Sequence, residues 1–358
     1  MRPNRRSRSF EDWPQADQEL WLAVIEVGDI LEGGGSGAHW ALTTKDNTRK
    51  AYAYWLQWLS ITGHLDPDTD PLDRITPERV ADYIAHRQNE LASLTTFVYI
   101  LDLLRLAQAA SERDWNWLKG VKNRLWARAH PEREKTSKIR HASDLFELGL
   151  DLMNEAEGIT CRYNPFAADT QFRDGLIISL LASRPVRLKN LTSIEIGRHL
   201  FKIGQTYWLI FEAHEVKNRR HIEVSLPQAL TEYLDRYLSQ HRPRLLGEAI
   251  SDSLWISRRA TSLRSNSIRH QLKQRTGDAF GKAITPHLFR DCAATSIAID
   301  DPEHVRVAAA VLGHHCLSTT QKYYDQSRML TAGRHYQSTM AAMRKDIRRQ
   351  GQPLALEI

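Results

Sequence analysis

The chain has 358 residues, which predicts one large or two ordinary domains, and 42% of them are hydrophobic, enough for real cores. No apolar run approaches the roughly 18 residues that a bilayer span requires, and no signal-peptide-like stretch follows the basic start, so we expect no membrane association. Three scattered cysteines show neither CxxC nor zinc spacing, which favours a reducing cytoplasm. The formal net charge of +6 and its clustering favour a polyanionic partner such as nucleic acid.

Residues 1–40 are predicted to form a basic, flexible N-terminal arm. Four arginines crowd the first eight residues, and the stretch Glu32–Gly37 has the glycine-rich composition of a flexible linker. A cationic arm suits contacts with a polyanion, and a solvated tail has the same composition.

Residues 41–130 are predicted to form a helical domain. Apolar residues recur at helical spacing in the segments 44–59 and 94–109. Between these segments, Thr76-Pro77-Glu78 has the N-cap residue, the first-turn proline and the acid that are typical of a helix start.

Two basic clusters are candidates for DNA contacts. A predicted helix over 115–129 interleaves tryptophans with cations, which suits a DNA-facing helix; a Trp-rich core with a hydrated basic face is an equally good interpretation. The second cluster lies further along the chain. The candidate residues are Lys119, Lys122 and Arg124 in the first cluster, and Arg258, Arg259, Arg264 and Arg269 in the second.

Residues 131–143 lack periodicity and are predicted to be a polar linker, followed by a second domain over 144–335 and a C-terminal helix or tail over 336–358. The second domain is expected to be mostly helical with a small antiparallel sheet, so the fold class is mainly α with α+β character. The three short strands are predicted at 193–196, 207–211 and 221–225.

Two cationic residues that could act on a phosphate lie before and within the predicted strand region. Arg187 follows a buried-looking helix, where its guanidinium fork can bind a phosphate. Lys217 lies in the tight turn between the second and third strands, from which it can donate a proton to a leaving oxygen. Each residue judged alone is better explained as an ordinary surface cation.

Two further patterns follow in the last third of the chain. Pro286 suits a helix start, and the spacing of His287 and Arg290 places both on one helical face, where they can bind a phosphate oxygen. The segment Leu312–Tyr324 contains a helix-ending glycine, then His314, a Ser-Thr-Thr cap and Tyr323 nine positions after the histidine.

The order of these residues resembles that of the tyrosine recombinase (phage integrase) family over residues 41–335, with its "LGH…TT…Y" and "H-x-x-R" boxes. The resemblance implies that residues 41–130 are a core-binding (DNA-binding) domain and residues 144–335 the catalytic domain. It implies that Arg187 and Arg290 clamp the scissile phosphate and that His287 and His314 sit beside its non-bridging oxygens. It implies that Lys217 protonates the leaving 5′ oxygen and that Tyr323 attacks phosphorus to form a 3′-phosphotyrosine.

Three positions complicate this assignment. The family usually has an acid three positions after its first arginine, and here that position is Asn190, which can accept a hydrogen bond but supplies no charge. Arg184 is an alternative for the first arginine, but Arg187 fits the neighbouring apolar positions better. Tyr324 adjoins Tyr323, and the spacing from His314 selects Tyr323.

We therefore predict a site-specific DNA recombinase, acting in integration, excision or resolution of a mobile element. It would need no metal and no ATP, because cations can stabilise the transition state and the covalent link conserves the bond energy. The predicted partners are double-stranded DNA and three further copies of the chain, and the need for accessory recombination proteins stays open. The alternatives are a type IB-like topoisomerase, a DNA-binding protein of this fold with impaired catalysis, and a helical scaffold protein.

Overall fold

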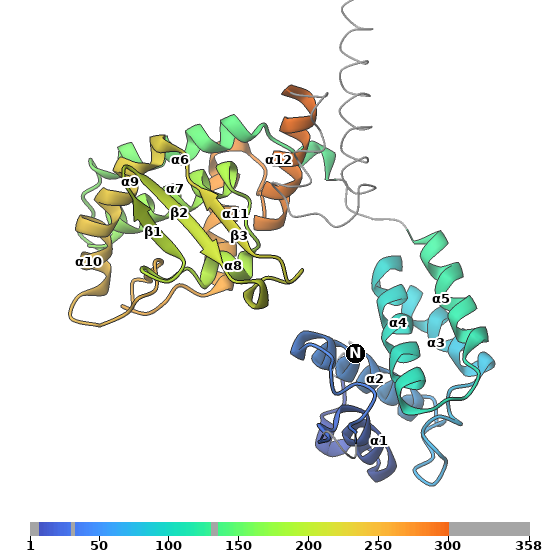
Figure 1. Ribbon diagram of the computed structural model, residues 1–358. Coiled ribbons are helices and arrows are strands. Elements are labelled where there is room, and N and C mark those ends of the chain that lie inside the picture. Colours follow the sequence, from blue (N-terminus) through green and yellow to red (C-terminus); the bar gives the residue numbers. More distant parts are fainter. Residues whose placement is uncertain (1–6, 30–32, 130–134, 301–358) are drawn as a thin grey trace, which may run out of the picture. The chain divides into compact units, whose positions relative to one another are not determined.

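The computed structural model describes residues 7–29, 33–129 and 135–300. The chain divides into two compact units, residues 1–134 and 135–358. Figure 1 shows that the first unit is helical and that the second packs helices against a sheet, which has three strands. Among the described residues, we find no helix with the length and apolar character that a bilayer crossing requires.

The described residues of the first unit form five α-helices around a core rich in aromatic side chains, which includes Trp55, Leu59 and Tyr83. The helix start at Thr76 is confirmed, since its side-chain oxygen accepts a hydrogen bond from the Arg79 backbone N–H at 3.3 Å. The helices are α1 (Gln15–Ile25), α2 (Leu42–Ile61), α3 (Pro77–Gln88), α4 (Ser93–Ala110) and α5 (Asn116–Arg128).

The described part of residues 1–40 is not a flexible arm, which corrects the prediction. Trp13, Trp21 and Val24 are buried in the core of the first unit, and the last two belong to α1. The glycine-rich stretch lies against the same helix: a Cβ on Gly35 would come within 2.0 Å of the Ala23 carbonyl oxygen. In this stretch the absence of a side chain at Gly35 allows close packing against α1. Composition alone does not distinguish such a packed segment from a flexible linker.

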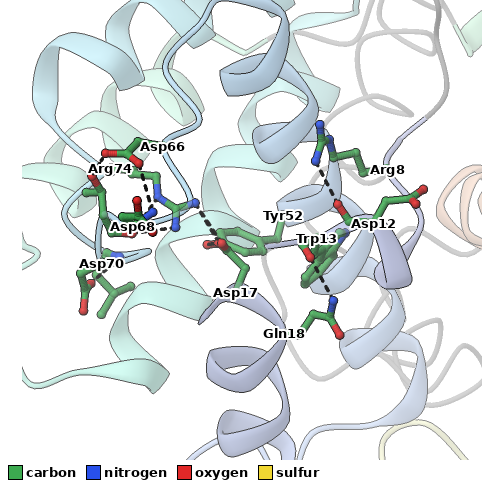
Figure 2. A network of polar contacts seen from close by, with 12 residues as sticks. Arg8, Asp12, Trp13, Asp17, Gln18, Tyr52, Asp66, Asp68, Asp70 and Arg74 are labelled. Atoms are coloured by element: carbon green, nitrogen blue, oxygen red, sulfur yellow. Dashed lines mark hydrogen bonds and ion pairs between the residues drawn. The ribbon is translucent and has the colours of Figure 1, made fainter. Parts of the chain in front are cut away.

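A buried ion pair joins α1 to the rest of the unit (Figure 2). The Arg74 guanidinium lies 2.9 Å from the Asp17 carboxylate, and both side chains are fully buried. The Tyr52 hydroxyl of α2 donates to the same carboxylate. Burial and the Asp17 charge raise the pKa of Tyr52 well above its usual value, which keeps this hydroxyl protonated as a donor.

The second unit has a core centred on the buried helix α7 (Ala167–Ser183), against which α6 (Ala142–Ala156) packs closely. A Cβ on Gly149 of α6 would come within 2.6 Å of the Gly175 carbonyl oxygen of α7. The other helices are α8 (Leu188–Thr192), α9 (Thr231–Arg236), a π-helical turn (Tyr237–His241), α10 (Arg242–Leu246), α11 (Ser265–Phe280) and α12 (Pro286–Asp300).

The sheet of the second unit is antiparallel with the order β1-β2-β3, which confirms the predicted fold class. Its strands are β1 (Leu200–Ile203), β2 (Thr206–Phe211) and β3 (Ile222–Ser225). The strand predicted over 193–196 is wrong, because Ser193 ends α8 and Glu195 and Ile196 form only isolated bridges. Gly197, with φ +79°, then turns the chain before β1.

Arg74→Met is expected to lower the free energy of unfolding by about 3–5 kcal/mol, because it leaves the buried Asp17 carboxylate without its counter-ion. Urea unfolding of the full chain, followed by tryptophan fluorescence, measures this loss. Arg113→Met is the matched control: it breaks an exposed ion pair with Asp73 and should cost about 0–1 kcal/mol. Equal losses in the two variants would contradict a structural role for the buried pair.

Candidate active site and nucleic-acid interface

The candidate site is organised by the short loop between α7 and α8. Arg184 ends α7 with its backbone N–H bonded to the Leu180 carbonyl at 2.7 Å, and the Val186 side chain that follows is buried. Arg187 is the N-cap of α8 and is half-buried. Its Nη1 donates to the side-chain oxygen of Asn218 at 3.2 Å.

The two arginines of this loop have different surroundings. Arg184 donates through Nε to the Ser225 carbonyl at the end of β3, at 2.9 Å, and through Nη1 to the Ser183 carbonyl. Burial lowers the pKa of Arg184. Because Arg184 holds the loop against the sheet, Arg187 is the better candidate for binding a phosphate.

Lys217 lies where the sequence predicted, in the turn between β2 and β3. The Arg219 backbone N–H donates to the Val216 carbonyl at 2.9 Å, so Lys217 and Asn218 are the two central residues of a four-residue turn. Arg219 follows in the left-handed region with φ +49°. The Lys217 side chain is exposed, as a proton donor to an incoming DNA strand must be.

The segment before this turn is fixed by a buried histidine. His199 accepts from the Glu195 backbone N–H at Nδ1 (3.1 Å), and its Nε2 lies 3.2 Å from Glu215. Desolvation raises the pKa of Glu215, but the hydrogen bonds from His199 and the Glu212 backbone outweigh it and leave that pKa lowered. Glu215 therefore stays ionised and anchors the base of the Lys217 turn.

Helix α12 brings the second candidate arginine to the same loop. The Arg290 side chain is only 8% exposed, and its Nη1 donates to the Pro185 carbonyl at 2.5 Å. His287, one turn earlier on α12, is exposed. Arg290 thus contacts the loop that presents Arg187, whereas His287 faces solvent in this structure.

One chain of contacts therefore joins Arg290, the loop with Arg187, and the turn with Lys217. His314, Tyr323 and Tyr324 lie outside the described residues. Within the ranges that the structure describes, no three histidine, cysteine or acidic side chains gather in a way that could hold a metal ion.

Asn190 does not support Arg187 in the predicted manner. Its side chain is 3% exposed on α8, and its Nδ2 has no hydrogen-bond partner among the described residues. The hydrogen bond from Arg187 goes to Asn218 instead. Asn218 was not among the residues predicted from the sequence. Its position directly after Lys217 in a strand-to-strand turn could have indicated it as a candidate.

A basic hollow of about 830 Å³ opens elsewhere on the second unit, between the loop 257–264 and the helices α7 and α11. Three of the predicted DNA contacts, Arg258, Arg259 and Arg264, line it, are exposed, and have no ion pair to a described residue. Arg269 does not line it and donates weakly to Asn266 at 3.4 Å. Sequence analysis missed the polar face of α11 that completes the lining: Ser267, His270, Gln271 and Gln274.

The tryptophans in and next to helix α5 include both a core residue and an exposed residue. Trp115, just before the helix, is buried in the core of the first unit, whereas Trp126 is 61% exposed and packs on Phe97 with ring centroids 5.0 Å apart. Of the three candidate cations on α5, Lys119 and Arg124 are exposed and Lys122 is half-buried.

Comparisons with known proteins show the family and the fold of this chain. The family model described as "Phage integrase family" matches residues 151–329, half of the chain. Tyrosine recombinases XerD of Staphylococcus saprophyticus subsp. saprophyticus and Staphylococcus aureus strain N315 are each 28% identical over 158 residues, 44% of this chain. The match spans about half the length of these relatives, 51%.

Solved structures extend the similarity to the fold of most of the chain. The XerH site-specific recombinase bound to palindromic difH substrate, in a post-cleavage complex, has a TM-score of 0.59 at 16% identity, covering 83% of this chain and 81% of that one. Its pre-cleavage complex with difH has a TM-score of 0.56 at 16% identity, covering 82% and 79%. These two likenesses show a shared fold.

Arg184→Met is expected to lower the free energy of unfolding by about 1 kcal/mol, because the Ser225 carbonyl loses its hydrogen bond. The matched Arg187→Met should change it by less than about 0.5 kcal/mol, since that side chain is half-buried and bonded to a turn. Urea unfolding of both variants measures the difference. A larger loss for Arg187→Met would make Arg187 the structural arginine of the loop.

Proposed function

Because the chain belongs to the phage integrase family, the tyrosine recombinases, we propose that it is a site-specific recombinase that cuts and rejoins DNA through a 3′-phosphotyrosyl intermediate on Tyr323. The observation that carries the proposal is the contact chain from Arg290 through the α7–α8 loop to the Lys217 turn. All six candidate catalytic residues lie within the matched range 151–329.

In the proposed reaction Tyr323 gives up its phenolic proton to solvent and reacts as the phenolate, which nearby cations favour. Its oxygen bonds to phosphorus as the bond to the 5′ oxygen breaks. Negative charge grows on the non-bridging oxygens, and Arg187 and Arg290 stabilise it as preorganised cations, with His287 and His314 beside them. Lys217 gives its proton to the departing 5′ oxygen, which is otherwise a very poor leaving group. A 5′ hydroxyl from another strand then reverses the attack, so no ATP is needed.

We propose that the substrate is duplex DNA in the cytoplasm and that four copies of the chain act on two paired sites. The structural relative XerH is described with a palindromic substrate, and a palindrome offers two equal half-sites, one for each of two protomers. Two such sites brought together then require four protomers. Integration, excision and resolution of a mobile element all use this arrangement.

A DNA-binding protein with impaired catalysis is the second candidate. It is favoured by Asn190, which takes the place of the family's usual acid and has a buried Nδ2 without a partner among the described residues. The two candidates differ in whether a covalent adduct forms, which the first experiment below decides. Strand exchange between two duplexes separates a recombinase from a type IB-like topoisomerase.

A nicked suicide duplex carrying the recombination site should trap the wild-type chain as a covalent adduct. Cleavage next to the nick releases a short fragment that carries the 5′ hydroxyl, and once this fragment has diffused away it cannot religate. Tyr323→Phe should abolish the adduct, since phenylalanine has no nucleophilic oxygen. Tyr324→Phe is the matched control and should keep the adduct. Denaturing gel electrophoresis measures the yield; an adduct that survives Tyr323→Phe but not Tyr324→Phe would move the nucleophile to Tyr324.

The basic hollow is proposed to hold the DNA backbone, so replacing its three exposed arginines should weaken the salt dependence of binding. The triple variant Arg258→Gln, Arg259→Gln and Arg264→Gln should reduce the slope of log affinity against log salt by about 0.9 for each phosphate that is no longer neutralised. Lys202→Gln is the control, because that exposed lysine is already paired with Asp235 at 2.7 Å. Titrations at several salt concentrations measure both; an unchanged slope in the triple variant would place the backbone elsewhere.

A further inference from the structure

We propose that Asn218 is a positioning residue that holds Arg187 in place of the acid absent at position 190. The inference rests on the proposed function and adds a residue to it. Asn218 also joins the arginine that binds the phosphate to the turn that carries the proton donor, because it directly follows Lys217.

The geometry of the turn makes Asn218 suitable for this role. The hydrogen bond from Arg219 to Val216 closes the turn, and the left-handed φ of Arg219 sets the direction in which the chain leaves it. Glu215, bonded to the buried His199, fixes the segment that enters the turn. The Asn218 side chain therefore projects from a restrained backbone toward a residue 31 positions earlier in the sequence.

The chemistry of the contact leaves Arg187 able to bind a phosphate. A guanidinium has five N–H donors, and the bond to the Asn218 oxygen uses one of them. A carboxylate in this role would neutralise part of the arginine charge through an ion pair, whereas an amide orients the group and leaves its full positive charge. Within the described residues no hydrogen bond joins Arg187 to Asn190, and the bond from Arg187 goes to Asn218.

The test compares single-turnover rates of adduct formation by the full chain on a nicked suicide duplex, at saturating protein so that weaker binding does not enter. Asn218→Ala is expected to slow cleavage on the order of 10- to 100-fold, because a guanidinium displaced by about 1 Å loses much of its effect. Asn218→Asp keeps an oxygen at the same place but pairs with the arginine charge, so it should recover part of the rate that Asn218→Ala loses. Equal losses in both variants, or no loss in Asn218→Ala, would overturn the proposal.

A second substrate separates positioning from a general structural defect. A methylphosphonate at the scissile position carries no charge on its non-bridging atoms, so cleavage of it depends little on Arg187. The penalty of Asn218→Ala should therefore shrink on this substrate, as should that of Arg187→Ala. An Asn218→Ala penalty that is the same on both substrates would mean a defect unrelated to Arg187 and would refute the assignment.

A third substrate tests the other end of the turn. A 5′-bridging phosphorothiolate releases a thiolate, which needs no proton, and so removes the requirement for Lys217. A penalty of Asn218→Ala that disappears only on this substrate would assign Asn218 to Lys217 and overturn its assignment to Arg187. If the wild-type chain forms no adduct on any of the three substrates, the proposed function itself fails, which is distinguishable from failure at Asn218 alone.

Discussion

The hydrogen bond from Arg290 to the Pro185 carbonyl is the interaction on which the candidate site depends. A buried guanidinium is costly unless its donors are bonded, and a backbone carbonyl at the end of a core helix is a fixed acceptor. The bond therefore fixes α12 relative to the loop after α7. The same loop carries Arg187, so this contact holds Arg290 against the loop from which Arg187 extends, as the proposed clamp on a phosphate requires.

Among the contacts that the structure describes, the arginines around the α7–α8 loop donate to neutral oxygens. Arg184 and Arg290 donate to backbone carbonyls, and Arg187 donates to the amide oxygen of Asn218. Bonds of this kind orient a guanidinium without cancelling its charge, which is what a transition state with growing negative charge requires. The ion pair of Arg74 with Asp17 shows the opposite arrangement: there both charges are buried and directed at each other, so the pair serves the fold and offers nothing to a ligand.

Local patterns predicted the features that depend on neighbours in the sequence. The helix starts at Thr76 and Pro286, the strands β2 and β3, and the turn that carries Lys217 all follow from spacing and residue type. The predictions fail where the structure depends on contacts between residues far apart in the sequence. The first 40 residues have the composition of an arm, yet Asp17 of α1 finds its counter-ion 57 residues away. The bond from Arg187 to Asn218 and the lining of the basic hollow, which joins residues from 164 to 275, have no local signature either.

The departure at position 190 therefore weakens the catalytic interpretation less than the sequence alone indicates. An acid beside a catalytic arginine has two effects: it fixes the direction of the guanidinium and it lowers the net charge of the site. The first effect is available from any well-placed oxygen, and the restrained turn at Asn218 provides one. The second effect opposes binding of a phosphate diester. An amide in place of the acid can therefore orient Arg187 in the proposed site. Because Asn218 directly follows Lys217, the proposed phosphate-binding arginine and the proposed proton donor belong to one hydrogen-bonded element.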